Sequence, residues 1–268
     1  MRTKRATHRR PALQAERRPV DRSRAGKARC TLLAATAILA ITHALPATAV
    51  QGNLEGSATL ASDYVFRGIS QTLEDPALQL GLDFEHRSGL FAGVWGSNVD
   101  FPSNALSDNP RNIEADLYVG FSKQLASDLS GSVVVTRYEY PGSDGRFDYS
   151  YTELGLGILF RDQLGASVSY SDDVMGRGAS GLVFEVSGRQ PLPHRVDLNV
   201  GLGYYDFGES YLENYAYWSL GVSTTRSAVT IDLSYIGTDQ AAERTFGDLA
   251  GNRVVLTVTG NLTIWRSD

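Results

Sequence analysis

The sequence predicts an all-β protein, namely a single antiparallel transmembrane β-barrel of about twelve strands, preceded by a cleaved signal peptide. Three observations lead to this fold class. From about Leu54 to Trp265, short stretches alternate apolar with polar or small residues. The N-terminus has the composition of an export signal, and the polar connections alternate between short and long. Because successive side chains on a strand point to opposite faces, each stretch has one apolar and one polar face.

The first 49 residues read as a secretory signal peptide, which leaves residues 50–268 for the barrel. Residues 1–30 hold eleven of the 25 Lys+Arg residues and two of the 30 Asp+Glu residues. The apolar run Thr31–Leu45 and the small-residue site Ala47-Thr48-Ala49 follow in the order of a secretory signal. The run of about 15 residues is shorter than the roughly 20 that a spanning helix needs. We expect cleavage after Ala49.

The export route and the use of cysteine follow from the same segment. The pairs Arg9-Arg10 and Arg17-Arg18 raise twin-arginine export as an alternative, but the residues after them do not continue that signal. The general secretory route is therefore favoured. Cys30, the single cysteine, precedes the apolar run, which disfavours lipidation. The mature region then has no disulfide and no thiol nucleophile.

The mature region is acidic. Removing the first 30 residues leaves 14 Lys+Arg and 28 Asp+Glu, a net charge of about −14, and Lys123 is the only lysine after the signal. Soluble domains usually carry many surface lysines, so this composition favours a membrane barrel. The negative charge argues against nucleic acid as a partner. After the signal, no apolar run is long enough for a transmembrane helix, so strands would span the membrane.

Twelve stretches have the alternation of a strand and lengths that suit membrane crossing. They are Leu54–Phe66, Ala77–His86, Leu90–Ser97, Asn112–Ser122, Leu129–Tyr140, Tyr151–Phe160, Leu164–Ser171, Leu182–Arg189, Val196–Tyr205, Tyr215–Thr224, Ala228–Ile236 and Val254–Trp265. The connections after the even strands are short, and most of those after the odd strands are longer and polar, as in Asn98–Arg111 and Gly237–Arg253. This asymmetry is typical of outer-membrane barrels and places both termini on the periplasmic side.

The two faces of the strands have opposite chemistry. The face expected to meet lipid carries Leu60, Tyr64, Phe66, Leu154, Leu156, Ile158, Phe160, Val168, Tyr170, Val196, Leu198, Val200, Leu202, Tyr204, Val229, Ile231, Leu233 and Tyr235. The residues expected to line the lumen are Asp63, Arg67, Asp83, Glu85, Glu114, Asp116, Glu153, Glu185, Asp197 and Asp232. A charge on the lipid face costs roughly 2–4 kcal/mol at mid-membrane, so these charges should face inward. For the third and fifth predicted strands, the pattern does not decide which residues face lipid and which face the lumen.

A soluble closed barrel or sandwich is the alternative fold, because alternation alone does not determine whether the apolar face points inward or outward. The scarcity of lysine, the signal peptide and the asymmetry of the connections favour the membrane barrel.

One segment carries a family resemblance. Ser62–Thr72 reads SDYVFRGISQT, and PALQLGLDFEH (Pro76–His86) and SGLFAGVWGSNVDF (Ser88–Phe101) follow. This run resembles the TorF family, a bacterial group known mainly as predicted outer-membrane porins. The resemblance implies a barrel, an exported location and a pore role, and it implies no enzyme chemistry. The chain departs from the usual pattern of such barrels because Trp265 is followed by Arg266, Ser267 and Asp268 rather than ending the chain.

No catalytic or metal site is predicted, and no cofactor. The mature region has two histidines, His86 and His194, and both fall beside predicted periplasmic turns, away from the outer lipid edge where a serine–histidine pair of a barrel phospholipase would sit. Loop acids such as Asp172-Asp173 have no calcium-loop spacing. Glycines 155, 157, 201 and 203 lie on inward faces, and no helix follows them as a phosphate loop would require.

The segment Ser62–Thr72 gives the sharpest site hypothesis. Asp63 and Arg67 are four residues apart, so on one strand they would share the inward face near the outer rim. They would then line a constriction, with one acid and one arginine producing a transverse field. The competing interpretation is a structural salt bridge that holds the first hairpin.

The sequence thus predicts an outer-membrane porin for passive diffusion of small polar solutes, with a preference for cations because carboxylates outnumber arginines inside. Its expected partners are outer-membrane lipid, small polar solutes or ions, and the barrel-assembly machinery. A lumen of twelve strands is narrow. The alternative is therefore a closed outer-membrane barrel with a structural or surface-display role.

Overall fold

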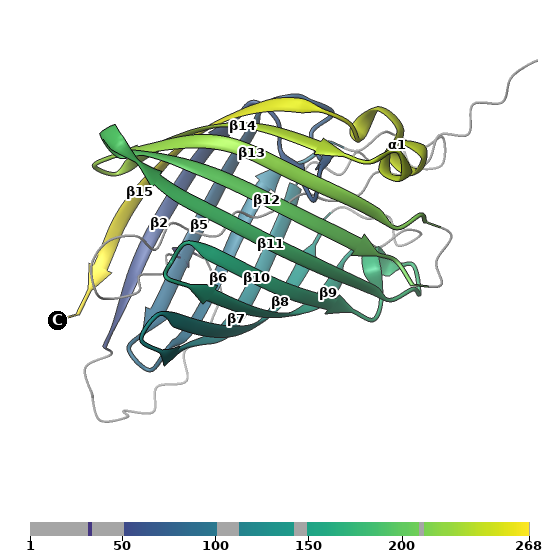
Figure 1. Cartoon of the computed structure of the whole chain (residues 1–268). Helices are drawn as coiled ribbons and strands as arrows, with labels where there is room; N and C mark the ends of the chain where they lie inside the picture. The colour runs from purple at the N-terminus through teal and green to yellow at the C-terminus, as the bar shows by residue number, and fades with distance from the viewer. Residues whose placement is uncertain (1–31, 34–50, 101–112, 142–148, 209–211, 268) are drawn as a thin grey trace, which may run out of the picture.

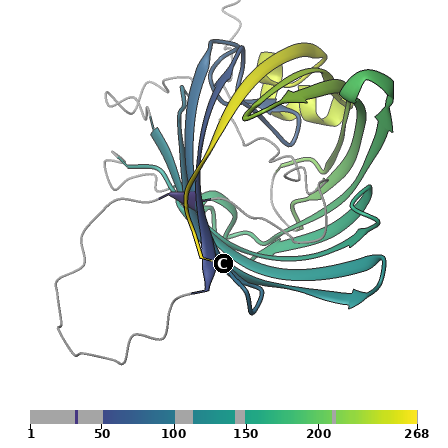
Figure 2. The ribbon, with the colours of Figure 1, turned by 90° about the vertical axis from the view of Figure 1, so that its left-hand side faces the viewer.

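The computed structural model describes residues 32–33, 51–100, 113–141, 149–208 and 212–267. Twelve strands of this described part form one closed antiparallel ring (Figure 1), which confirms the predicted barrel. Each strand pairs with its neighbours in chain order, and the ring closes because the last strand pairs with the first. Figure 2 looks along the barrel from the end at which the chain terminates and shows the strands curving around the lumen.

The strands of the ring are β2 (Gly52–Ala61), β5 (Ala77–His86), β6 (Leu90–Asn98), β7 (Ile113–Ala126), β8 (Leu129–Glu139), β9 (Tyr151–Phe160), β10 (Leu164–Ser171), β11 (Gly181–Leu192), β12 (Val196–Asp206), β13 (Tyr215–Arg226), β14 (Val229–Thr238) and β15 (Arg253–Arg266). The other elements are β1 (Leu32–Leu33), β3 (Val65–Phe66), β4 (Ile69–Ser70), the helix α1 (Gln240–Phe246), and the 3₁₀ turns η1 (Val174–Gly176), η2 (Pro193–Arg195) and η3 (Gly247–Leu249). The predicted signal peptide lies outside the described residues apart from β1, which pairs with β5.

The two rims of the barrel differ as the sequence predicts. On one rim, connections of two or three residues join β5 to β6, β7 to β8, β9 to β10, β11 to β12 and β13 to β14. All connections on the opposite rim are longer, and that rim carries α1 (Figure 1). Both ends of the ring lie on the short-turn rim, where Asn53 pairs with Arg266 and the Ser267 backbone N–H donates to the carbonyl of Gly52 (3.0 Å). The residues after Trp265 therefore continue the ladder as far as Ser267.

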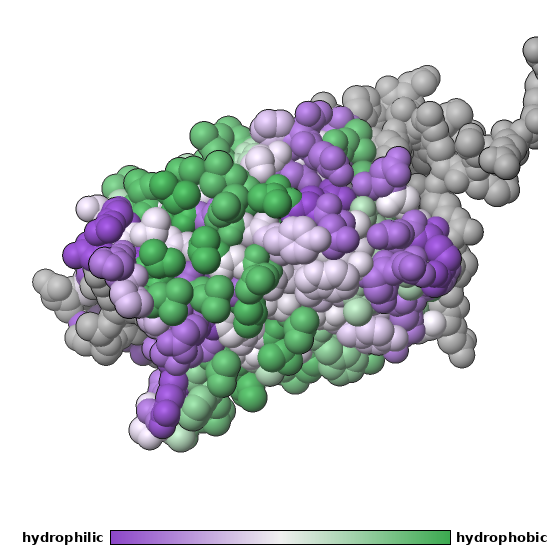
Figure 3. Space-filling model, turned by 45° about the horizontal axis from the view of Figure 1, so that its top comes forward, coloured by the Kyte–Doolittle hydropathy of each residue, from purple (hydrophilic) through white to green (hydrophobic). Residues whose placement is uncertain are grey.

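The outer surface carries an apolar belt, which Figure 3 shows as a green band between two hydrophilic ends. Leu233 on β14 is 47% exposed, Leu202 on β12 is 64% exposed and Leu156 on β9 is 51% exposed. The facing of the two ambiguous strands is now settled. Leu90 on β6 and Val133 and Val135 on β8 point outward and are exposed, whereas Trp95 packs against the buried residues inside.

The predicted first strand, Leu54–Phe66, is wrong at its C-terminal end. β2 stops at Ala61, and the chain then turns into the lumen as the short hairpin of β3 and β4. Tyr64 and Phe66 were expected to meet lipid but are 5% and 2% exposed. The reason is local: the two residues between β3 and β4, Arg67 and Gly68, have φ values of 52° and 83°. Positive φ at both central positions makes the tight hairpin turn that reverses the chain.

The loop-side half of the lumen is filled by a packed core. Tyr138 and Tyr151 stack with ring centroids 4.4 Å apart, and Phe66 of the hairpin meets Tyr138 edge-on at 5.9 Å. The helix α1 closes the same end, since Phe246 packs edge-on against Tyr215 at 5.6 Å. The side chain of Asp239 caps α1 by accepting hydrogen bonds from the first backbone N–H groups. The connection Gly237–Arg253, which the sequence predicts as long and polar, thus contributes buried residues to the lumen.

In the residues that the structure describes, no helix has the length and apolar character needed to cross a membrane.

The belt predicts a depth-dependent cost for charge. On β14, Leu233→Arg places a charge at the centre of the belt, whereas Val229→Arg places it at the first residue of the same strand, beside a short turn. Both side chains are similarly exposed, 47% and 43%. We expect L233R to lower the free energy of unfolding by about 2–4 kcal/mol and V229R by about 0–1 kcal/mol. Urea unfolding in lipid vesicles measures both, and equal costs would contradict a lipid-facing belt.

Candidate lumen site

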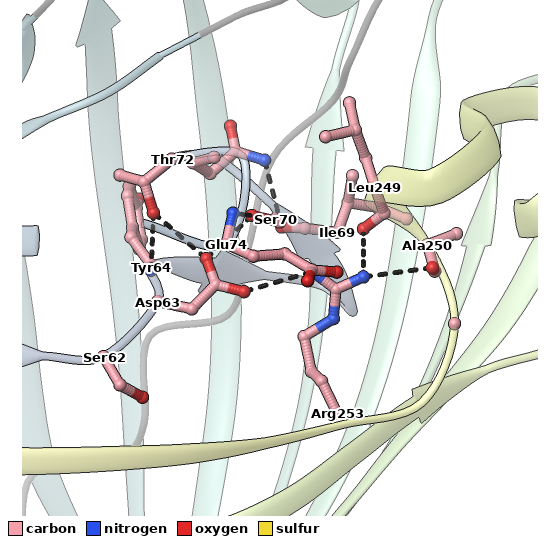
Figure 4. A network of polar contacts seen from close by, with 12 residues as sticks. Ser62, Asp63, Tyr64, Ile69, Ser70, Thr72, Glu74, Leu249, Ala250 and Arg253 are labelled. Atoms are coloured by element: carbon pink, nitrogen blue, oxygen red, sulfur yellow. Dashed lines mark hydrogen bonds and ion pairs between the residues drawn. The ribbon is translucent and has the colours of Figure 1, made fainter. Parts of the chain in front are cut away.

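The polar core of the lumen begins at Asp63, two residues after the end of β2 (Figure 4). The Asp63 carboxylate accepts hydrogen bonds from the hydroxyls of Ser70 (2.7 Å) and Thr72 (3.0 Å) and from Nη1 of Arg253 (3.1 Å). The backbone N–H of Tyr64 donates to Oγ1 of Thr72 (3.1 Å). These contacts hold the two sides of the hairpin together. They also give the buried polar groups the hydrogen bonds that such groups need.

Arg253 links the hairpin to the last loop of the barrel. Its Nη2 donates to the carbonyl oxygens of Leu249 (2.8 Å) and Ala250 (3.0 Å), while its Nη1 contacts Asp63. Nη1 also lies 3.4 Å from a carboxylate oxygen of Glu74 (Figure 4). A single guanidinium therefore fastens the hairpin to the connection between β14 and β15.

The tip of the hairpin is bound to the far wall. Arg67 donates from Nη1 and Nη2 to the two carboxylate oxygens of Glu153 on β9 at 2.9 and 2.8 Å. β9 is five positions around the twelve-strand ring from β2, so the pair spans the lumen. The side chains are 4% and 7% exposed. The Arg67 guanidinium also lies 4.7 Å from the Phe66 ring centre and 5.1 Å from that of Tyr205.

The charge of Arg67 is maintained by its partner. Burial alone would lower the pKa of the guanidinium, but the Glu153 carboxylate, helped by hydrogen bonding, holds that pKa well above its ordinary value. Removing either partner would leave the other charge buried without its counter-ion, a change that typically costs about 3–5 kcal/mol. The hairpin therefore depends on this pair for its position.

The hypothesis that Asp63 and Arg67 share one strand face is wrong. Both lie in the inward-folded connection, and they pair with Arg253 and Glu153 respectively. The physical reason is that each finds an opposite charge on another part of the ring after the chain turns at Arg67-Gly68. The salt-bridge interpretation is closer to the structure, but it involves two bridges to distant partners. The transverse field at a constriction stays a prediction.

A cavity of about 220 Å³ lies beside the Arg67–Glu153 pair. Glu185 on β11 reaches it, and its carboxylate accepts hydrogen bonds from the Tyr217 hydroxyl (2.7 Å) and, at 3.5 Å, from the Ser167 hydroxyl. The cavity is lined by Phe66, Arg67, Ser132, Val134, Thr136, Tyr138, Glu153, Gly155, Leu156, Gly157, Ser167, Ser169 and Glu185. Of the predicted lumen residues, this site brings together Arg67, Glu153 and Glu185.

One arrangement of residues occurs twice on the inner wall. Tyr217 on β13 lies opposite Gly203 on β12 and reaches across it to Glu185 on β11. In the same way Tyr118 on β7 lies opposite Gly93 on β6 and donates to Asp83 on β5. A Cβ atom on either glycine would collide with the tyrosine ring. These glycines therefore make room for a tyrosine to hydrogen-bond a carboxylate two strands away.

The other predicted lumen residues are spread around the wall. Asp197 forms an ion pair with Arg189 (3.1 Å), and Asp232 accepts from Ser234 (2.8 Å). Glu85 is half-buried near the short-turn rim, opposite Asn53.

Glu114 and Asp116 are both fully buried in the packed loop-side half, not in an open lumen. Burial and the nearby Glu114 carboxylate raise the pKa of Tyr140, which follows β8. These two acids therefore lie in the packed part of the interior, and their predicted role in lining a passage stays a prediction.

Sequence reasoning missed several functional side chains. The sequence pattern does not indicate Arg253, which neutralises Asp63, or the cavity hydroxyls of Ser132, Thr136, Ser167 and Ser169. The available signal is the set of small inward residues on β9 and β10, which includes Gly155 and Gly157. Among the described residues, no group of three His, Cys, Asp or Glu side chains is arranged to hold a metal ion.

The fold and its interior define a class: a closed antiparallel barrel with an apolar exterior, a polar lumen and an inward-folded hairpin. The chain belongs to the family described as "Bacterial protein of unknown function (Gcw_chp)", whose model matches residues 47–264. That description does not test the TorF name, which stays a prediction. No curated protein matches the chain.

Several solved structures are similar to the chain. The KdgM porin is 7% identical, with 80% of this chain and 99% of that chain covered and a TM-score of 0.47. The NanC porin is 9% identical, with 79% and 100% covered and a TM-score of 0.47. An outer membrane channel from Pseudomonas putida F1 is 12% identical, with 85% and 100% covered and a TM-score of 0.46.

The buried hairpin predicts that Ile69 is inaccessible, since it is 0% exposed. Residues 50–268 contain no cysteine, so in protein produced without residues 1–49 the substitution Ile69→Cys supplies a unique thiol. We expect a membrane-impermeant maleimide to label I69C slowly. Adding Glu153→Gln removes the carboxylate charge that holds Arg67, so the hairpin should open more often. The labelling rate should then rise at least about tenfold, which corresponds to a change of about 1.4 kcal/mol in the free energy of hairpin opening.

The control for this experiment is Arg244→Ala. Arg244 forms a similar bidentate ion pair with Glu213, but this pair is exposed on the long-loop rim. Its loss should leave the labelling of I69C unchanged. Rapid labelling of I69C in the otherwise unaltered chain would contradict the inward position of the hairpin.

Proposed function

We propose that this protein is an outer-membrane barrel for the passive passage of small polar solutes, in which the inward-folded hairpin forms the constriction. The observation that carries the proposal is the inverted polarity of the barrel: an apolar belt outside and a polar, partly hollow interior. An even number of antiparallel strands with one short-turn rim and one long-loop rim is the arrangement of bacterial outer-membrane barrels.

The proposal includes the expected processing and partners. Residues 1–49 act as a signal peptide that is removed after Ala49, and residues 50–268 form the barrel. The partners are outer-membrane lipid around the belt, the barrel-assembly machinery during insertion, and small polar solutes or ions inside. No catalytic residue and no cofactor is proposed.

The charge of the lumen supports a preference for cations. Arg67, Arg189 and Arg253 each form an ion pair with a lumen acid, so their charges are balanced. The inward faces also carry Asp83, Glu85, Glu185 and Asp232, so acids outnumber arginines among these lumen residues. Rings or clusters of carboxylates in a pore favour cations over anions.

A second function, a closed barrel with a structural or surface role, is favoured by one observation. The hairpin residues Ile69, Ser70 and Gln71 are 0% exposed, so the hairpin is packed tightly within the loop-side half. If it never moves, the barrel would not conduct. The two functions therefore differ in whether the hairpin leaves its position.

Planar lipid bilayers test the proposed passage and its selectivity. We expect reconstituted protein to give stepwise currents, and reversal potentials in a salt gradient to show a higher permeability for cations, because the lumen carries an excess of carboxylates. Anion preference would contradict the charge argument. Electrical silence of correctly folded protein would favour the closed barrel.

Weakening the hairpin's anchor predicts a larger current. Glu153→Gln leaves the buried Arg67 without its counter-ion, so the hairpin should leave its position more often. We therefore expect the mean conductance to rise at least about twofold, which is a small change for the loss of a buried ion-pair partner. Glu213→Gln, at the exposed pair with Arg244, is the matched control and should conduct like the unaltered protein. A lower conductance in E153Q would show that the hairpin supports passage and does not restrict it.

A further inference from the structure

The cavity beside the hairpin exists because one part of the inner wall has small side chains. Ser132 on β8, Gly155 and Gly157 on β9, and Ser167 and Ser169 on β10 all face it. Elsewhere on the wall, tyrosines such as Tyr118 and Tyr217 fold across glycines and occupy the space. The hollow is therefore bounded on one side by small residues and on the other by the hairpin.

Three charged side chains line this cavity: Arg67, Glu153 and Glu185. Arg67 and Glu153 neutralise each other through two hydrogen bonds, so the carboxylate of Glu185 leaves the site with one net negative charge. Its described partners, Tyr217 and Ser167, are neutral hydroxyls, and the contact with Ser167 is long at 3.5 Å. A cationic donor would make a stronger hydrogen bond to this carboxylate than a hydroxyl does.

The remaining polar groups of the cavity are hydroxyls. Ser132, Thr136, Ser167 and Ser169 each present a group that both donates and accepts. A ligand that carries a hydroxyl group can form hydrogen bonds with these side-chain hydroxyls. A cation without a hydroxyl group would leave these side chains without a hydrogen-bond partner on the ligand. The volume of about 220 Å³ is below the range of about 300–1,000 Å³ usual for sites of drug-sized ligands. The site therefore suits a small solute.

We infer that this cavity binds small hydroxylated organic cations of the alkanolamine class, with the ammonium group on Glu185 and the hydroxyl among the serines of β8 and β10. This inference rests on the proposed function, since it names the class of solute that pauses in the lumen. The site would lie directly under the constriction formed by the hairpin, next to the Arg67–Glu153 pair.

Three probes of nearly equal size test the inference: ethanolamine (cation), ethylene glycol (neutral) and glycolate (anion). Each is titrated into isotopically labelled protein in detergent micelles, and the NMR shifts of the Gly155 and Gly157 amides report occupancy. We expect saturable binding of ethanolamine, at least tenfold weaker binding of ethylene glycol and no saturation with glycolate. Glycolate binding as tightly as ethanolamine would overturn the inference.

Two variants locate the site. Glu185→Gln keeps the acceptor for the Tyr217 hydroxyl but removes the charge, and it should raise the Kd for ethanolamine at least tenfold. Ser169→Leu keeps Glu185 and fills the cavity, and it should abolish saturation. The matched control is Glu55→Gln, since Glu55 lies on β2 and contacts Asn53 and Arg266 rather than the cavity.

The variants also separate this inference from the proposed function. Unchanged ethanolamine binding in E185Q would refute the site even if the barrel conducts. Conversely, binding in micelles by a barrel that is silent in bilayers would refute passive passage and leave the site standing. The spectrum outside the cavity reports whether each variant is folded, so a failure to fold is recognised directly.

Discussion

The buried ion pair between Arg67 and Glu153 is the interaction on which the interior of this barrel depends. Placing two charges where they are nearly inaccessible to water carries a large desolvation cost, which only good geometry and full hydrogen bonding offset. Here both terminal nitrogens of the guanidinium meet both carboxylate oxygens, and two aromatic rings lie against the cation. The pair spans the lumen, so it determines where the hairpin sits, how much of the lumen stays open and which wall bounds the cavity.

The polarity of the barrel explains why such pairs are found inside. Because the outward positions are apolar, the charged and hydroxylated residues of each strand fall on the inward face. A twelve-stranded ring leaves too little room for all of these to be hydrated as in bulk water. They are satisfied instead by one another: Asp63 by Arg253, Asp197 by Arg189, and the carboxylates of Asp83 and Glu185 by tyrosines that cross a glycine. The cavity is the place where small residues interrupt this filling.

The strands could be predicted from the sequence because a period of two is a local property. The ranges Tyr151–Phe160 and Leu164–Ser171 agree with β9 and β10, and Glu153 and Glu185 both line the cavity. The hairpin could not be predicted in this way. Tyr64 and Phe66 continue the alternation of β2, so the pattern is the same whether the chain stays in the wall or turns inward. The turn is Arg-Gly, which lacks the Asn-Gly or Asp-Gly signal of a tight hairpin. Its anchor, Glu153, is 86 residues away along the chain, and the cavity depends on that distant contact.

A double-mutant cycle on Arg67 and Glu153 tests the central claim most directly. The free energies of unfolding of R67M, E153Q and the double variant, compared with the unaltered protein in the same lipid, give the coupling between the two side chains independently of their other contacts. We predict that the double variant is more stable than the sum of the single changes implies, by about 1–3 kcal/mol, the upper part of the range for residues in direct contact. Additive effects, with a coupling near zero, would show that the hairpin is not held across the lumen by this pair.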